Sequence, residues 1–291
     1  MKSFFGLVLL VFSPMVSAQI SGIVKDSISS APISYVHISV ENENLGTSTE
    51  EDGRFTLRVD ENKILVFSAL GYQTKKCKAA QATEIRLKPV SYALDEIVIA
   101  KRLETREREI GKTSTQAYQA FDRGPSIDAK FFPYDVSYKK TKFLKQVVVV
   151  TDSKIDGAVF KIHFYSVGDD GLPGQELLNK DFIVSVGQGV KQTKLNLSKL
   201  NLKMPKDGIF VGFEKLLIEK NKWEKTSIDP NTQQTQTQKA YYPFLLYNAV
   251  DSQPTFAFSG GKWVRQNPKE TDTSTTMPQV LEPVIFLVLS N

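Results

Sequence analysis

Short segments in which hydrophobic and polar residues alternate run through most of this 291-residue chain, and Gly, Asp and Asn separate them. Clear examples are 54–59 (RFTLRV) and 158–167 (AVFKIHFYSV). A period of two puts successive side chains on opposite faces of a β-strand, whereas an amphipathic helix needs a period near 3.6. The pattern therefore predicts an all-β protein. The composition, 41% hydrophobic and 24% charged, is that of a globular chain and excludes collagen-like and low-complexity classes.

The first 18 residues have the pattern of a cleaved signal peptide. Lys2 gives a positive start, residues 4–12 are apolar, and Val16-Ser17-Ala18 supplies the small residues that a signal peptidase reads. The apolar stretch is too short to span a membrane as a helix, and so is the final apolar run, 283–289. We expect export with Gln19 as the mature N-terminus, no lipid anchor and no transmembrane span.

Five alternating segments lie between Gln19 and residue 100, and Asp52-Gly53 is a strong tight-turn signal between two of them. This density of short strands predicts a small seven-stranded antiparallel sandwich over residues 19–100. The segments are 20–25, 35–40, 54–59, 63–69 and 83–88.

Several motifs occur here in order: Gly22-Ile23-Val24-Lys25-Asp26, Ala31-Pro32-Ile33, Asp52-Gly53-Arg54-Phe55 and Phe67-Ser68-Ala69-Leu70-Gly71-Tyr72. Over residues 20–89 this series resembles the carboxypeptidase-regulatory-like domain, a transthyretin-like sandwich of exported Bacteroidetes proteins. Residues 94–99 (LDEIVI) resemble the strand that follows this domain in TonB-dependent receptors. The resemblance implies a cell-envelope protein, in the periplasm, associated with the outer membrane or at the cell surface.

A charge-dense stretch, 101–126, lacks an apolar face and is predicted to be an exposed linker or short helix. Alternation returns from residue 127 to 291, where a larger jelly-roll-type sandwich is expected. Its polar, Thr/Gln-rich segments 226–240 and 266–279 are predicted to be surface loops. With the motifs 160–165 (FKIHFY), 171–174 (GLPG) and 208–214 (GIFVGFE), residues 125–291 also resemble the second domain of Bacteroidetes regulatory-like-domain proteins, a resemblance that implies no activity. The expected strands are 129–134, 143–151, 158–167, 176–186, 190–197, 208–218, 241–247, 255–258, 262–265 and 283–289.

Net charge and cysteine content exclude further classes. The +5 net charge comes from scattered basic residues rather than the concentrated stripe of a nucleic-acid binder. Cys77 is the only cysteine, so an intramolecular disulfide is impossible. We expect Cys77 to be a small apolar residue of a strand, the alternative being a disulfide-linked dimer.

A carboxypeptidase activity is not expected from the sequence. A zinc peptidase needs two histidines and a glutamate around the metal. The only histidines, His37 and His163, head no His-x-x-Glu motif and lie in different predicted domains, so each is interpreted as a strand histidine. No Gly-x-Ser-x-Gly elbow is present either. We predict no catalytic residues, no cofactor and no enzyme activity.

Two weak binding candidates remain. Asp169 and Asp170 share one turn and could contribute to a calcium site, although Asp is common in ordinary turns. Four aromatic residues could form a platform for a sugar or peptide, although aromatics also dominate sandwich cores. They are Trp223, Tyr241, Tyr242 and Trp263.

These observations favour a non-catalytic envelope protein that binds or scaffolds, with an envelope protein or a glycan as its partner. The alternative is a glycan-binding or accessory subunit of an envelope hydrolase or an outer-membrane uptake system. Nucleic acid is not expected as a partner.

Overall fold

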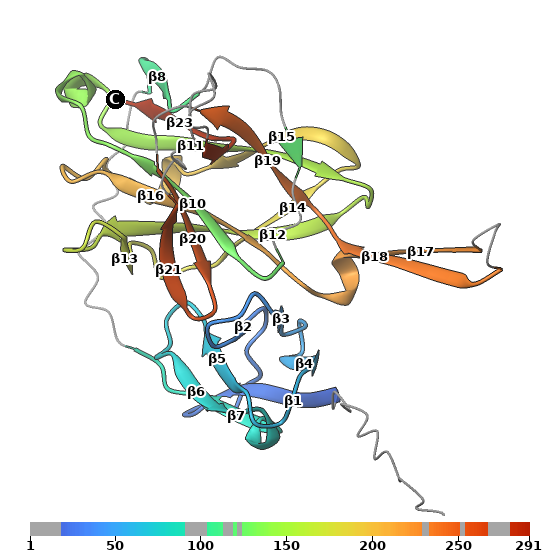
Figure 1. Cartoon of the computed structure of the whole chain (residues 1–291). Coiled ribbons are helices and arrows are strands. Elements are labelled where there is room, and N and C mark those ends of the chain that lie inside the picture. The colour runs from blue at the N-terminus through green and yellow to red at the C-terminus, as the bar shows by residue number, and fades with distance from the viewer. Residues whose placement is uncertain are drawn as a thin grey trace, which may run out of the picture.

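The computed structural model describes residues 19–90, 104–112, 119–120, 124–228, 233–250, 254–266 and 280–291. The predicted signal peptide, residues 94–99 and most of 266–279 lie outside these ranges. Within them the chain consists of β-strands and four short 3-10 helices, so the all-β prediction is confirmed. The strands form two sandwiches, the first blue to cyan in Figure 1 and the second green to red.

Seven strands build the first sandwich from two sheets, in the orders β4-β1-β7 and β3-β2-β5-β6. The expected seven strands are therefore present, and all their pairs are antiparallel except β1 with β7, which run parallel. Their bounds are β1 Gln19–Asp26, β2 His37–Val40, β3 Gly46–Ser48, β4 Arg54–Arg58, β5 Ile64–Ser68, β6 Lys75–Lys78 and β7 Glu84–Leu87, with η1 Ala79–Gln81 before β7.

Alternation decides which side chains enter the first core. In β4, Phe55 and Leu57 are buried while Thr56 and the two flanking arginines are exposed. Gly53, in the predicted turn before β4, has φ +78°, and a Cβ there would lie 2.8 Å from the carbonyl oxygen of Val24. Glycine is required at this turn because it accepts positive φ and leaves room for that carbonyl.

Two seven-stranded sheets form the second sandwich. One has the order β13-β12-β16-β10-β20-β21, with β14 also on β12, and is called here the inner sheet. The other has the order β22-β19-β11-β23-β8, with β15 on β11 and β9 on β19. The bounds are β8 Glu107–Ile110, β9 Gln119–Ala120, β10 Ile127–Phe132, β11 Phe143–Ser153, β12 Ala158–Val167, β13 Pro173–Glu176, β14 Phe182–Val186, β15 Gly189–Asn196, β16 Ile209–Lys215, β19 Phe244–Val250, β20 Thr255–Ser259, β21 Lys262–Gln266, β22 Val280–Pro283 and β23 Ile285–Ser290.

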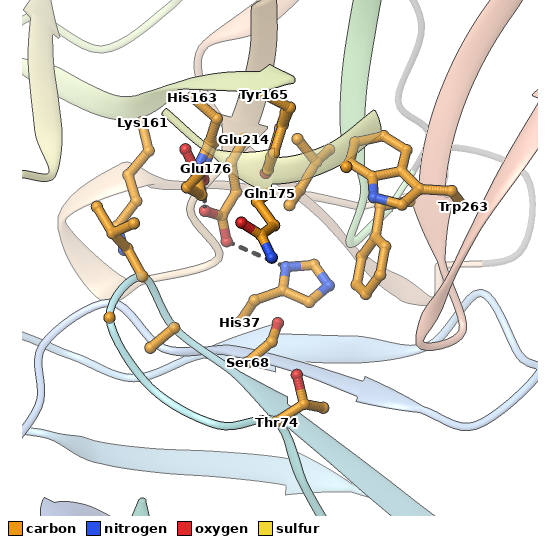
Figure 2. A pocket seen from close by; sticks show the side chains of 16 residues that line it. His37, Ser68, Thr74, Lys161, His163, Tyr165, Gln175, Glu176, Glu214 and Trp263 are labelled. Atoms are coloured by element: carbon orange, nitrogen blue, oxygen red, sulfur yellow. Dashed lines mark hydrogen bonds and ion pairs between the residues drawn. The ribbon is translucent and has the colours of Figure 1, made fainter. Parts of the chain in front are cut away.

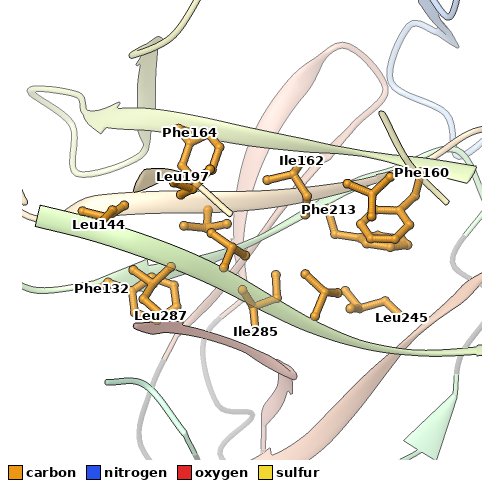
Figure 3. Packing of buried hydrophobic residues seen from close by; sticks show 14 of the residues in the cluster. Phe132, Leu144, Phe160, Ile162, Phe164, Leu197, Phe213, Leu245, Ile285 and Leu287 are labelled. Atoms are coloured by element: carbon orange, nitrogen blue, oxygen red, sulfur yellow. The ribbon is translucent and has the colours of Figure 1, made fainter. Parts of the chain in front are cut away.

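The main core lies between these two sheets (Figure 3). Phe160, Ile162 and Phe164 of β12 meet Leu144 of β11 and Leu287 of β23 in it. Burial of large side chains at about 1.5–3 kcal/mol each is the main force that holds the sandwich together. Three 3-10 helices lie in the connections: η2 Val136–Lys140, η3 Ser198–Leu200 and η4 Glu219–Asn221.

Two polar segments differ from the sequence-based expectation. The segment 226–240 is predicted to be a loop, but most of it belongs to strands β17 (Lys222–Ile228) and β18 (Thr235–Tyr241), which pair as a hairpin that projects from the body (Figure 1). In the expected linker 101–126, residues 107–110 form β8 and pair with the edge of β23. These three strands are largely exposed, so backbone pairing forms them without the hydrophobic alternation that signals a half-buried strand.

Cys77 lies in β6, half-buried against the first core. Burial raises the pKa of its thiol, only partly offset by the charge of Lys75, and the thiolate is the reactive form. We therefore expect a thiol reagent to label the native protein at least about tenfold more slowly than the urea-unfolded protein. The measurement is the rate of modification by mass spectrometry. Equal rates, or a reducible dimer on a gel, would contradict a structural role.

Candidate functional site

One face of β12 is lined with polar and aromatic side chains although it is buried. In FKIHFY, the residues Phe160, Ile162 and Phe164 enter the main core, so Lys161, His163 and Tyr165 occupy the opposite face by strand alternation. All three are buried: the first sandwich covers Lys161 through the carbonyl oxygen of Tyr35, and Tyr165 packs against Trp263 of the same sheet. The polar side chains must therefore find partners inside the protein.

His163 is held between two carboxylates. Its Nδ1 lies 2.6 Å from Oε1 of Glu176 in β13, and its Nε2 lies 2.8 Å from Oε2 of Glu214 in β16. Burial alone would lower the pKa of His163, but the charges and hydrogen bonds of the two glutamates outweigh it and raise the pKa to about 10. Both ring nitrogens therefore donate, and His163 is a buried imidazolium.

Glu214 also receives a histidine from the first sandwich. Oε1 of Glu214 lies 3.1 Å from Nδ1 of His37 in β2 (Figure 2). Burial alone would raise the pKa of Glu214, but the hydrogen bonds from both histidines and the charge of Lys161 lower it well below its usual range. The carboxylate is thus ionised and accepts from both rings. The row Glu176, His163, Glu214 and His37 crosses the boundary between the sandwiches.

Further hydrogen bonds join the two sandwiches around this row. The Nζ of Lys161 donates to the carbonyl oxygen of Tyr35 at 2.9 Å and lies 3.3 Å from Asp181. The amide of Glu219 donates to Oε1 of Glu50 at 2.9 Å, and that of Asn42 donates to the carbonyl oxygen of Gly260 at 3.0 Å. These contacts fix His37 opposite Glu214.

Gly212 leaves the space that this row occupies. It pairs with His163 in the register between β12 and β16. A Cβ at Gly212 would lie 3.2 Å from the Tyr165 ring and 3.3 Å from Cβ of His163. Any larger residue would press on both side chains, so this glycine permits the close packing of the site.

A cavity of about 310 Å³ opens beside the row, between the two sandwiches. The first sandwich contributes His37, Ser68 and Thr74. The second contributes the other three members of the row together with Tyr165, Gln175 and Trp263 (Figure 2). Its size is at the lower end of small-molecule sites, and its mixture of aromatic and convergent polar groups is typical of them.

The structure brings only one of the aromatic candidates to this cavity. Trp263, in β21, lines it, and its ring contacts Tyr165 and Phe258 at centroid distances of 5.3 and 5.4 Å. Trp223 and Tyr242 pack against the main core instead, and Tyr241 lies on the projecting hairpin. The four side chains do not form one platform.

Asp169 and Asp170 lie exposed in the turn between β12 and β13. Oδ1 of Asp170 accepts from the amide of Leu172 at 3.0 Å, the bond of an ordinary Asx turn. Nowhere in the part of the chain that the structure describes do three His, Cys, Asp or Glu side chains group as a metal site.

Sequence reasoning missed the central row. Its two histidines lie in different predicted domains, so the sequence gives no reason to expect that they meet. In the structure both point at the carboxylate of Glu214. One usable signal was present: in 158–167 the aromatic and apolar residues occupy both faces of the strand, which indicates that both faces are covered.

Comparison with known proteins gives the domain type of the first sandwich. The CarboxypepD_reg-like domain family matches residues 20–99. The first sandwich is therefore a CarboxypepD_reg-like domain. The family match covers the first sandwich, which carries His37, and does not extend to the second sandwich with Glu214 and His163.

A curated relative is the TonB-dependent receptor SusC of Bacteroides thetaiotaomicron, 34% identical over 80 residues. Those residues are 28% of this chain and only 8% of the receptor, so the similarity concerns one domain. No helix among the described residues is long and apolar enough to cross a membrane.

Similarity to solved structures is weak. The cysteine protease and lectin-like domains of Cwp84, a surface layer associated protein of Clostridium difficile, align over 84% of this chain and 45% of that chain, with 13% identity and a TM-score of 0.38. An infectious bursal disease virus structure (Gt strain) aligns over 94% and 60%, with 12% identity and a TM-score of 0.25. Neither supports a functional argument.

Proposed function

We propose that this protein is an exported, non-catalytic module of the cell envelope that binds and scaffolds within an outer-membrane uptake system. The observation that carries the proposal is the CarboxypepD_reg-like domain at residues 20–99, shared with a TonB-dependent receptor. The signal-peptide pattern of residues 1–18 supports delivery to the periplasm, where a module of this kind meets such a receptor.

The chemistry of the buried row supports a structural rather than a catalytic role. A general base needs a ring nitrogen that can take up a proton near neutral pH. Both nitrogens of His163 already donate to carboxylates, and the pKa of His163 is about 10. His163 therefore stays protonated at neutral pH and serves to join strands, while Glu214 joins the two sandwiches.

A photo-crosslinking experiment in the native bacterium tests the proposed association. A photoreactive amino acid is placed in the full chain either at Thr56, on the exposed face of β4, or at Gln192, on the exposed face of β15. If the shared domain makes the contact, Thr56 crosslinks to a TonB-dependent outer-membrane receptor identified by mass spectrometry, and Gln192 gives at least about fivefold less product because it lies on the other sandwich.

The Gln192 variant controls for expression and export, since both sites lie on the surface of the same protein. Equal receptor yields at the two sites would place the contact elsewhere. Absence of any TonB-dependent receptor among the products of either site would contradict the association.

A further inference from the structure

The cavity between the sandwiches contains a buried polar atom that has no partner. His37 is 3% exposed, and among the described residues its Nε2 has no hydrogen-bond partner. Its Nδ1 faces the ionised carboxylate of Glu214 and so carries the ring proton. In this tautomer Nε2 presents its lone pair, which is an acceptor. An unmet buried acceptor is costly, and a ligand hydroxyl would satisfy it.

Aromatic residues form one wall of the same cavity. Trp263 and Phe258 face each other across strands β20 and β21, and His37 lies 5.7 Å from the Phe258 ring. Trp263 is only half-buried, so part of its ring is available. A flat aromatic ring offers apolar contact to the C–H face of a ligand.

The remaining lining is polar and charge-balanced. Ser68, Thr74 and Gln175 bring hydroxyl and amide groups to the cavity (Figure 2). The two cations, Lys161 and His163, are matched by the two carboxylates, Glu176 and Glu214. A charged ligand would have to disrupt these pairs, whereas a neutral ligand rich in hydroxyl groups would not.

We propose that this cavity binds a single neutral sugar ring, which packs one face on Trp263 and donates a hydroxyl to Nε2 of His37. A volume of about 310 Å³ suits one small ring rather than a longer chain. The inference adds a ligand site to the binding role proposed above, and its failure would leave the receptor crosslink unaffected.

Isothermal titration with glucose, galactose and mannose tests the site in the full chain. We expect saturable binding of at least one of them with a Kd on the order of 1 mM, as expected for so small a ligand. Trp263→Ala should weaken it at least about tenfold, and Gln175→Ala should weaken it less. One monodeoxy analogue of the bound sugar should bind about tenfold more weakly, because it leaves the His37 acceptor unmet.

Trp223→Phe is the matched control, because Trp223 lies at the base of the β17–β18 hairpin and does not line the cavity. It should leave the Kd unchanged, and circular dichroism confirms the fold of each variant. No saturation up to about 50 mM would mean that the cavity holds water only and would overturn the proposal. An unchanged Kd in Trp263→Ala would also overturn it. Tighter binding of glucuronate or glucosamine than of any neutral sugar would do the same.

Discussion

Replacing His163 with alanine should lower the free energy of unfolding by about 3–5 kcal/mol. The substitution removes the imidazolium from between Glu176 and Glu214 and leaves both carboxylates without their shared counter-charge. Glu214 is 2% exposed, so bulk solvent does not compensate fully for the lost counter-charge. Urea unfolding followed by circular dichroism measures the change at pH 6.

A double-mutant cycle separates the interaction between His163 and Glu214 from the general cost of deleting a buried ring. With Glu214→Gln in place, one of the two carboxylates is already neutral, so the added loss from His163→Ala should be at least about 1 kcal/mol smaller than in the wild type. A loss below about 1 kcal/mol for His163→Ala alone would show that the row is not a buried charge network.

The contribution of the row to stability should be greatest between about pH 4.5 and pH 6.5. Interactions in the fold lower the pKa of Glu214 from 4.5, so its stabilising effect is present above pH 4.5 and is lost as the pH falls below it. The pKa of His163 is raised from 6.5 to about 10, so its effect is complete below pH 6.5 and is lost as the pH rises towards 10. The difference in unfolding free energy between wild type and His163→Ala, measured from about pH 3 to pH 10, should therefore peak in this window.

Asn221→Ala supplies the control for this pH profile. Asn221 is fully buried, and its amide bonds both backbone groups of Val159 and the carbonyl oxygen of Leu216. Its loss should destabilise the chain by a few kcal/mol, but by the same amount at every pH because an amide does not titrate. A flat difference for His163→Ala as well would contradict the assigned charges.

The fold could be predicted because its signal is local. In β4 the alternation of single residues predicts both the strand and its buried face, and in β12 it predicts the strand, although both faces of β12 are buried. The hairpin β17–β18 could not be predicted, because the Thr and Gln residues of its exposed strands show no alternation of apolar and polar side chains. Strand β8 could not be predicted either, because its charged sequence forms a strand only by pairing with β23.

The candidate site could not be predicted, because it depends on how two sandwiches dock. Nothing near His37 in the sequence indicates that its partner is Glu214. The same holds for Lys161, which resembles a solvated strand residue until the carbonyl oxygen of Tyr35 covers it. Of the four aromatic candidates, the structure places only Trp263 at the cavity.

The shared carboxylate of Glu214 limits how freely these domains can be exchanged. Related first domains occur on other proteins, which suggests a portable unit. Here, however, a graft that lacked a histidine at position 37 would leave one oxygen of Glu214 buried without its donor. A chimera that folds as stably would therefore need that histidine or a simultaneous change of Glu214. Position 37 and position 214 are thus expected to change together rather than one at a time.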